Sequence, residues 1–253
     1  MEINRRAFMS LAAAAAVGRA AGAAALETGH GIRFKAIVFD GFAVFNPGSV
    51  EALVESRFPG RGRGLMEAWR SRQFEYQWLR ALGGQYADFR KTTEDSLKFA
   101  AVQLRLEMPD DTLQELLRVY RRPDAWPDVG GSLSALRSAG LRLAILSNMN
   151  HAMLVDGLER SALTGSFDAV ISTDAIRSFK PDPRAYNLPV EALKLSREEI
   201  LFVPFAGWDV AGARWFGYPT FWMNRSGAPL EYLGVKPDAV GADMKDLQAF
   251  VLG

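Results

Sequence analysis

The stretch FKAIVFDGFAVF, residues 34–45, places a lone aspartate, Asp40, directly after an apolar run that is typical of a buried strand. An ion that is buried without a partner is costly. Asp40 must therefore be paired, lie at an open strand end or take part in chemistry. Taken alone, it could equally be a turn residue or a helix cap, so the rest of the chain has to decide.

Apolar runs and helical patterns alternate over most of the chain. Besides residues 34–39, four runs are expected to be strands: LRLAIL (141–146), DAVIS (168–172), EILFVP (199–204) and YPTFWM (218–223). Three segments between them are typical of helices: GSLSALRSAG (131–140), RAYNLPVEALKL (184–195) and WDVAGARWFG (208–217). The alternation predicts an α/β fold with a Rossmann-like parallel sheet, which binds ligands at the carboxyl ends of its strands.

A long segment without a convincing strand follows the first strand. Helical patterns fill most of it, at residues 61–82, 88–106 and 109–122. We therefore predict a helical cap domain of residues 47–124, inserted into an α/β core domain of residues 33–46 and 125–253.

Polar residues follow four strands of the predicted sheet: Asp40, Ser147 with Asn148, Lys180, and Asp209. Each has an ordinary explanation alone, as a turn or loop residue, a surface lysine or a helix cap. Strand ends of a parallel sheet meet at one edge, however, and all four follow such ends. Together they favour a reaction site with a carboxylate nucleophile and a lysine that stabilises negative charge.

The N-terminal residues 1–30 have a different character. Arg5 and Arg6 precede an Ala-rich apolar run and a small-residue stretch, which is typical of a twin-arginine export signal. Arg19 within the run favours the alternative of a fraying helix, and the run is too interrupted to be a firm membrane span. The signal predicts a periplasmic protein with no membrane contact after its removal; without it, the protein is cytoplasmic.

Composition excludes several classes of function. The chain of 253 residues has a formal net charge of +1 and no cysteine, which gives no support for nucleic-acid binding and excludes thiol chemistry. No G-x-S-x-G or G-x-x-x-x-G-K-[ST] motif occurs. His151 is expected to begin a helix rather than to act as a base.

The motifs FKAIVFD, LAILSN, FKPDPRAY and LFVPFAGWDVAGARWFGYPTFWMNRSG resemble those of the haloacid dehalogenase superfamily. The resemblance is closest to the L-2-haloacid dehalogenase branch. It extends to FPGRGRGLMEAWRSRQFEYQWLRAL and TTEDSLKFA in the predicted cap, and covers about residues 33–245.

This resemblance implies hydrolysis of a small halogenated carboxylic acid to a 2-hydroxy acid, through an ester on Asp40. It implies that Arg70 guides the substrate and takes the halide, and that Ser147 and Asn148 hold the substrate carboxylate. Lys180 would stabilise Asp40, with Tyr186 in support, and Asp209 would orient the hydrolytic water. Four residues match the apolar wall around the substrate, where ordinary packing is the alternative for each: Phe42, Phe74, Phe89 and Trp208. A plain surface arginine is the alternative for Arg70.

The resemblance implies no cofactor and no metal ion. Phosphatases of the superfamily carry a second aspartate two residues after the nucleophile, where this chain has Phe42. Too few oxygen ligands are expected at this edge for a hard divalent cation. A phosphatase is therefore disfavoured.

The chain departs from the branch at three positions. The branch has a threonine after the nucleophile, which is here replaced by Val44 or lost in a one-residue deletion, and Pro204 and Ala206 stand where it has a serine and an asparagine. The losses predict a slow dehalogenase, and leave open a homologue that binds small carboxylates without turning them over. Relatives in the branch often form homodimers through cap helices, so a homodimer is also expected.

Overall fold

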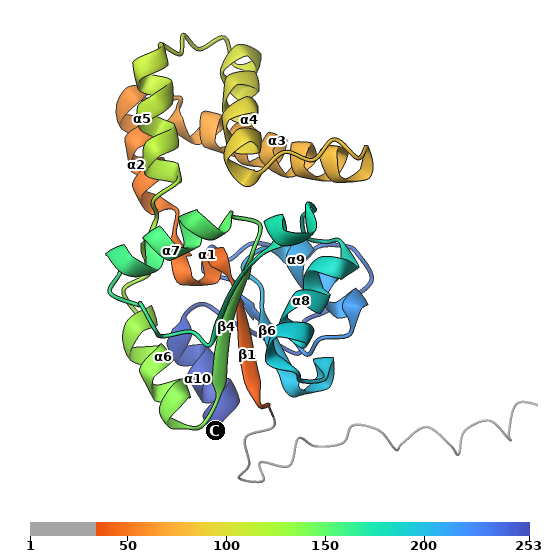
Figure 1. Ribbon diagram of the computed structural model, residues 1–253. Coiled ribbons are helices and arrows are strands. Elements are labelled where there is room, and N and C mark those ends of the chain that lie inside the picture. Colours follow the sequence, from red (N-terminus) through yellow and green to blue (C-terminus); the bar gives the residue numbers. More distant parts are fainter. Residues whose placement is uncertain (1–33) are drawn as a thin grey trace, which may run out of the picture. The chain divides into compact units, whose positions relative to one another are not determined.

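In the computed structural model, which describes residues 34–253, strand β1 (Ala36–Asp40) lies inside a four-stranded parallel sheet (Figure 1). The strand order is β5–β4–β1–β6. The partners are β4 (Arg142–Ser147), β5 (Ala169–Ser172) and β6 (Ile200–Val203). Val38 is in register with Ala144 on one side and Phe202 on the other. The Rossmann-like parallel sheet predicted from the alternating pattern is confirmed.

The two faces of β1 are covered by different helices. Ile37 and Phe39 belong to a large buried cluster with α6 (Val129–Ser138), α7 (His151–Arg160) and α10 (Met244–Leu252). Ala36 and Val38 face a second cluster, which includes side chains of α8 (Pro183–Leu193) and α9 (Gly207–Phe216). Figure 1 shows α6 and α10 on one side of the strands and α8 and α9 on the other. Since alternate residues of a strand point to opposite faces, an uninterrupted apolar strand suits this three-layer arrangement.

Four helices lie between two short strands that follow β1. The chain passes through the short helix α1 (Gly41–Val44) and β2 (Phe45–Asn46) into them. They are α2 (Gly48–Arg57), α3 (Gly62–Leu82), α4 (Phe89–Gln103) and α5 (Asp110–Tyr120). The chain returns through β3 (Asp124–Ala125), which pairs antiparallel with β2. The predicted helices are present, whereas their status as a separate cap domain stays a prediction.

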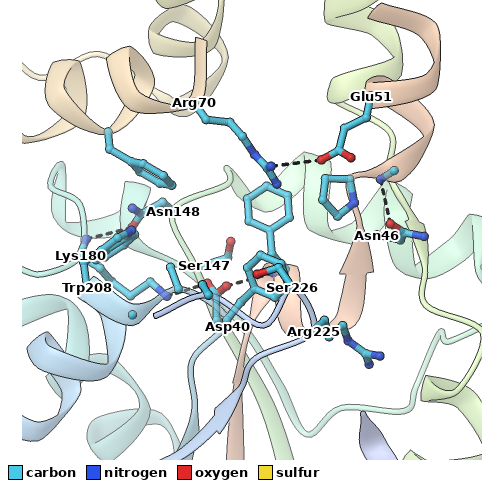
Figure 2. A pocket seen from close by; sticks show the side chains of 18 of the residues that line it. Asp40, Asn46, Glu51, Arg70, Ser147, Asn148, Lys180, Trp208, Arg225 and Ser226 are labelled. Carbon is cyan, nitrogen blue, oxygen red and sulfur yellow. Dashed lines mark hydrogen bonds and ion pairs between the residues drawn. The ribbon is translucent and has the colours of Figure 1, made fainter. Parts of the chain in front are cut away.

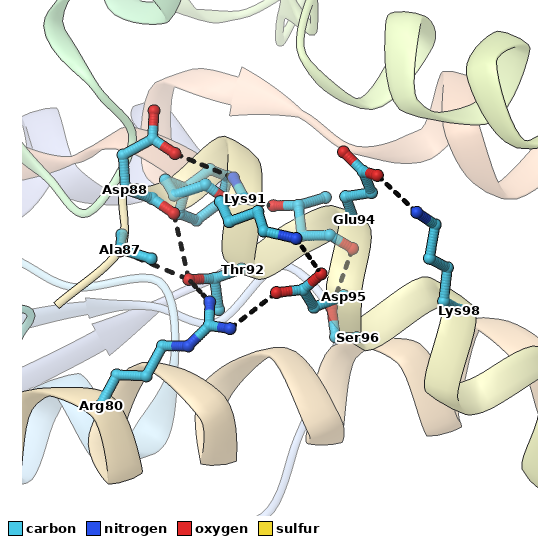
Figure 3. A network of polar contacts seen from close by, with 11 residues as sticks. Arg80, Ala87, Asp88, Lys91, Thr92, Glu94, Asp95, Ser96 and Lys98 are labelled. Atoms are coloured by element: carbon cyan, nitrogen blue, oxygen red, sulfur yellow. Dashed lines mark hydrogen bonds and ion pairs between the residues drawn. The ribbon is translucent and has the colours of Figure 1, made fainter. Parts of the chain in front are cut away.

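A network of charged side chains joins α3 to α4 (Figure 3). Arg80 of α3 reaches Asp95 of α4 at 2.6 Å, and Lys91 contacts the same carboxylate at 2.6 Å. Asp88 caps α4 by accepting a hydrogen bond from Lys91 N at 2.8 Å. Beneath this network Trp69, which is fully buried, donates from Nε1 to the carbonyl of Thr93 at 2.9 Å. These contacts fix α3, and with it the residues that α3 carries.

The C-terminal part differs from the sequence expectation. The run at 218–223 forms only a short strand, β7 (Phe221–Met223), which pairs with β8 (Ala239–Gly241) in a separate two-stranded sheet. A single bridge between Phe202 and Thr220 links it to β6. The 3₁₀ turns η1 (Thr173–Ile176) and η2 (Arg197–Glu199) complete the described structure. The export signal predicted for residues 1–30 lies outside the described residues.

Candidate active site

Asp40 ends β1 and begins α1 at the same time. Its Oδ2 accepts a hydrogen bond from Phe42 N at 3.1 Å, as a helix cap does, and its Oδ1 lies 2.6 Å from Lys180 Nζ. The residue is 8% exposed. The explanation of Asp40 as a helix cap is therefore correct, and the cap and the ion pair fix the carboxylate at the strand end; its role as a nucleophile stays a prediction.

Lys180 is shared by two carboxylates. Its Nζ lies 2.6 Å from Asp40 and 2.5 Å from Asp209 Oδ2, and the ammonium is almost completely buried. The alternative of a surface lysine is therefore wrong. Asp209 is the third residue of α9, whose cap position is Ala206, so its explanation as a helix cap is also wrong. Its other oxygen accepts a hydrogen bond from the Tyr186 hydroxyl at 2.7 Å.

Burial and pairing shift the pKa values in this chain of contacts. Burial opposes the charge of Lys180, but Asp209 and Asp40 outweigh it and raise the pKa of Lys180. Burial raises the pKa of Asp209 to about 6, against the opposing effect of Lys180. Burial and Asp209 raise the pKa of Tyr186 well above its usual value, so its hydroxyl remains a donor. The ammonium is thus kept charged between the two carboxylates.

Asn148 and Ser147 make contacts that position the loop after β4. Asn148 Oδ1 accepts from the backbone N of Lys180 at 2.9 Å, and its Nδ2 donates to Gln77 Oε1 at 2.8 Å. Ser147 Oγ accepts from Met149 N at 3.1 Å. Asn148 thus ties the loop that carries Lys180, between η1 and α8, to helix α3.

A cavity of about 640 Å³ opens over Asp40 (Figure 2). Nine of the residues singled out in the sequence line it: Asp40, Phe42, Arg70, Phe74, Phe89, Ser147, Asn148, Lys180 and Trp208. Phe74 and Trp208 meet edge to face, with ring centroids 5.2 Å apart. Asp209 and Tyr186 do not line the cavity and lie behind Lys180. Asp209 therefore contacts Lys180 directly, from behind the lining of the cavity, and its role in orienting the hydrolytic water stays a prediction.

Arg70 reaches the cavity from α3 and meets a carboxylate there. Its Nη1 lies 3.1 Å from Glu51 Oε1, and the two side chains are 37% and 47% exposed. Neither Glu51 nor the helix that carries it is recognisable from the sequence pattern. Only Val50 and Val54 of α2 are buried, so the helix has too weak an apolar pattern to be recognised.

Other lining residues missed from the sequence come from two loops. Trp126 follows β3, and its Nε1 donates to the carbonyl of Phe42 at 3.1 Å. Arg225 lies over Trp126, 4.6 Å from the ring centroid, and forms two hydrogen bonds with Asp128, at 3.0 and 2.9 Å. The remaining missed lining residues are Asn46, Pro47, Gly48, Tyr120, Phe205, Gly207, Ser226, Ala228 and Glu231. Their contacts join segments distant in sequence, which no local pattern encodes.

The three substituted positions differ in their surroundings. Val44 is fully buried in the large apolar cluster and does not line the cavity. Pro204 is buried, and its carbonyl accepts from Met223 N at 3.0 Å. Ala206 lines the cavity and brings no polar side-chain group to it. The losses therefore leave that part of the wall with fewer hydrogen-bonding groups.

Residues 34–253 offer neither a metal-binding group of side chains nor a helix suited to a lipid bilayer. No group of three or more histidine, aspartate or glutamate side chains gathers in residues 34–253 in a way that could hold a metal ion. In the same range, no helix has the length and apolar character that crossing a lipid bilayer requires.

Residues 11–217 match the family model of the haloacid dehalogenase-like hydrolases. The chain is 41% identical over 207 residues to haloacetate dehalogenase H-2 of Moraxella sp. (strain B), covering 81% of this chain and 92% of that protein. It is 40% identical over 205 residues to the (S)-2-haloacid dehalogenase of Pseudomonas sp. (strain YL), covering 81% and 88%.

A solved structure agrees with these sequence matches. It is the L-2-haloacid dehalogenase from Xanthobacter autotrophicus with chloropropionic acid covalently bound, to which this chain is 38% identical, with a TM-score of 0.78. The match covers 87% of this chain and 99% of that one. The resemblance inferred from the motifs is confirmed, and the chain belongs to the haloacid dehalogenase-like hydrolase family, in its L-2-haloacid dehalogenase branch.

Proposed function

We propose that this protein hydrolyses short 2-haloalkanoic acids to 2-hydroxy acids, without a metal ion and through an ester on Asp40. One observation carries the proposal: the Asp40 carboxylate opens into a largely apolar cavity while Lys180 holds its Oδ1 at 2.6 Å. The covalently bound chloropropionic acid in the related Xanthobacter structure supports an intermediate of this kind.

In the first step a carboxylate oxygen of Asp40 attacks C2 of the acid. A carbon–oxygen bond forms as the carbon–halogen bond breaks, and the halide leaves with the electron pair. Lys180 positions Asp40, and its charge stabilises the negative site. The aromatic wall of Phe42, Phe74, Phe89 and Trp208 excludes water from the displacement, and Arg70 takes the leaving halide.

In the second step water attacks the ester carbonyl of Asp40 and releases the 2-hydroxy acid with inverted configuration at C2. Lys180 contacts Oδ1 of Asp40 and the backbone N–H of Phe42 contacts Oδ2, so the oxygen that is not esterified keeps one donor, which stabilises the oxyanion that develops there. The wall near Ala206 supplies no side-chain donor or acceptor to the water. Loss of one preorganised contact lowers a rate by about 10² to 10³, so this step is expected to limit turnover.

A protein that binds small carboxylates without turning them over is the second candidate. Pro204 and Ala206 favour it, because they bring no polar side-chain group to the site. A phosphatase is disfavoured by Phe42, which lines the cavity at the position where phosphatases of the superfamily carry a second aspartate.

The test is chloride release from L- and D-2-chloropropionate without added metal, with Asp40→Asn as the control. Release of many equivalents from one enantiomer, abolished in the variant, supports the hydrolase. A single equivalent, with a persistent adduct on the Asp40 peptide by mass spectrometry, indicates a stalled ester. Binding without any release supports the second candidate.

Export and dimer formation are parts of the proposal that rest on other features. The paired Arg5 and Arg6 support periplasmic export, which fractionation of cells with Arg5→Lys/Arg6→Lys tests.

Exposed apolar side chains on α3 and α4, namely Leu79, Leu82 and Val102, support a homodimer. Sedimentation of the protein and of Leu82→Lys measures whether this surface joins two copies.

A further inference from the structure

A second cavity, of about 460 Å³, shares no lining residue with the one over Asp40. Four arginines line it: Arg90, Arg118, Arg121 and Arg122. The other lining residues are Gln114, Asn150, Ala152, Met153 and Asp156. We propose that this second cavity is a binding site for a phosphate group, carried by free phosphate or by pyrophosphate. The proposal goes beyond the reaction on Asp40 and does not depend on it.

Residues of three helices come together around the second cavity. Gln114, Arg118 and Arg121 follow one another at intervals of four and three residues, which places them on one face at the C-terminal end of α5. Arg90 is the second residue of α4. Asn150 is the cap residue of α7, and residues 152 and 153 in the first turn of that helix also line the cavity. Parts of the chain that are distant in sequence therefore meet at one space.

The charge of Arg121 is only partly compensated by carboxylates. Its Nη2 lies 3.8 Å from Glu94 Oε2, while Glu94 accepts a hydrogen bond from Lys98 at 2.6 Å. Burial lowers the pKa of Arg121, and the neighbouring Arg90 lowers it further, against the opposing effect of nearby carboxylates. Two guanidinium groups thus lie close together beside the cavity. A bound anion relieves repulsion of this kind, because an opposite charge favours the charged form of each group.

Arg90 and Arg118 are exposed, and neither forms an ion pair with a carboxylate of residues 34–253. Glu115, one turn before Arg118, pairs instead with an arginine of α2. Asp156 is the one carboxylate among the lining residues, and it accepts two hydrogen bonds from Arg122, at 3.0 and 3.3 Å. Four positive side chains therefore line the second cavity with one negative side chain. A ligand with two or more negative charges balances this excess.

The ends of the helices explain only part of this cluster of arginines. Cations are favourable at the C-terminal end of α5, which accounts for Arg118 and Arg121. Arg90 lies in the first turn of α4, however, where the helix end carries partial positive charge and favours anions. The first turn of α7, which also lines the cavity, has the same polarity. Side chains and two helix ends therefore contribute positive charge to one place.

A phosphate group fits this arrangement better than a carboxylate does. The guanidinium of arginine pairs with either group through two parallel hydrogen bonds. A carboxylate offers two oxygens in one plane, whereas a phosphate offers oxygens in a tetrahedron and carries more charge. The arginines come from α4 and from the end of α5 with the residue after Arg121, so they reach the ligand from more than one helix. This geometry suits tetrahedral oxygens.

The test is calorimetric titration of the full-length protein with phosphate and with pyrophosphate, at constant ionic strength. The variants are Arg90→Gln and Arg118→Gln, whose exposed side chains can be replaced without opening the core. Arg63→Gln is the matched control. Arg63 is 92% exposed on α3, pairs with Glu67 and lines neither cavity, so its substitution changes the net charge equally.

We expect the unsubstituted protein to bind one equivalent of pyrophosphate with a dissociation constant below about 1 mM, and to bind phosphate more weakly because it carries less charge. Arg90→Gln and Arg118→Gln should each weaken pyrophosphate binding about three- to tenfold, since each removes a charged donor. Arg63→Gln should leave the affinity unchanged. No binding of pyrophosphate, or an equal loss in Arg63→Gln, overturns the proposal.

Two further titrations locate the ligand and identify its chemistry. Arg70→Gln alters the cavity over Asp40 and should leave the affinity for pyrophosphate unchanged. A loss in that variant, with none in Arg90→Gln, assigns the anion to the cavity over Asp40 and overturns the proposal. The tricarboxylate citrate should bind more weakly than pyrophosphate, and tighter binding of citrate overturns the assignment of the site to phosphate. None of these titrations measures chloride release, so the proposed function can fail while this site stands, and the reverse.

Discussion

Lys180 Nζ lies 2.5 Å from Asp209 Oδ2, and each of these side chains is only 1% exposed. A buried ammonium and a buried carboxylate compensate the cost of removing each other from water. Lys180 also holds Asp40 at 2.6 Å. Its removal therefore leaves two carboxylates without a counter-charge at the end of the sheet.

Lys180→Met is expected to destabilise the protein by about 3–5 kcal/mol at pH 8, because uncompensated buried charges remain. The pKa of Lys180 is higher in the folded protein than in the unfolded chain. The contribution of Lys180 to the free energy of unfolding is therefore complete at any pH below its pKa in the unfolded chain, and is lost only when the pH rises through its pKa in the folded protein. The destabilisation caused by Lys180→Met should be smaller at pH 5, because Asp209, with a pKa of about 6, takes up a proton there. Urea unfolding at both pH values measures this. The exposed Lys245→Met serves as the control, and an equal loss at both pH values would contradict the explanation.

Asp209→Asn is expected to remove the acid limb of the pH–rate profile. Burial raises the pKa of Asp209 to about 6, so below this pH the residue becomes neutral and Lys180 pairs with Asp40 alone. Asp40 is then a weaker nucleophile, and the rate of adduct formation should fall as the pH drops through 6. The variant should be slow and nearly independent of pH between about 5 and 8. A variant that keeps the acid limb would show that another group titrates.

Gly212→Ala is expected to disturb the site through Tyr186. A Cβ at Gly212 would overlap the Tyr186 hydroxyl and lie 2.8 Å from Pro181 Cβ. Overpacking of this kind costs about 1–3 kcal/mol, and moving the hydroxyl breaks its hydrogen bond to Asp209. Tyr186→Phe removes that hydroxyl. The double variant Gly212→Ala/Tyr186→Phe should therefore be more stable than the sum of the two single-variant losses in unfolding free energy predicts. Denaturant unfolding of all four proteins measures the coupling, and simple additivity would contradict the proposed overlap.

Ala206→Asn is expected to accelerate hydrolysis of the ester on Asp40. Ala206 lines the cavity and holds the cap position of α9 without a side-chain hydrogen bond. An asparagine there can cap the helix, which adds about 0.5–1 kcal/mol of stability. It also supplies an amide donor, for which a rate gain of about 10² is expected. Decay of the adduct by mass spectrometry measures the gain. Ala206→Asp caps the helix without an amide donor, so an equal gain in that variant would exclude the donor as the cause.

Much of the α/β part could be predicted from short apolar runs. The run at 141–146 corresponds to β4 (Arg142–Ser147), and the run at 168–172 to β5 (Ala169–Ser172). Strands buried on both faces leave a strong signal because nearly every residue is apolar. The run at 218–223 was misassigned to the central sheet because the partner of β7, the short strand β8, has almost no pattern of its own.

The site was predictable where strand ends define it. Asp40, Ser147 and Asn148 meet because the parallel strands β1 and β4 deliver them to one edge, and the loop between η1 and α8 brings Lys180 to Asp40. Glu51 and the Asp128–Arg225 pair were not predictable, because their partners lie far away in the chain. The position of Asp209 behind Lys180 also required coordinates, since side-chain direction at the start of a helix depends on its packing.

Strands β2 and β3 pair Phe45 with Ala125 and Asn46 with Asp124, where the helices α2–α5 leave and rejoin the chain. The two ends of the inserted segment are therefore neighbours, and a short hairpin could connect them without altering the register of the central sheet. The inserted segment could therefore be exchanged as a unit. It carries Glu51 and Arg70, while the nucleophile and its lysine belong to the scaffold. The part of the cavity wall carried by α2–α5 and the nucleophile with its lysine are thus encoded in separable stretches of sequence, so that this part of the wall can change while the nucleophile is retained.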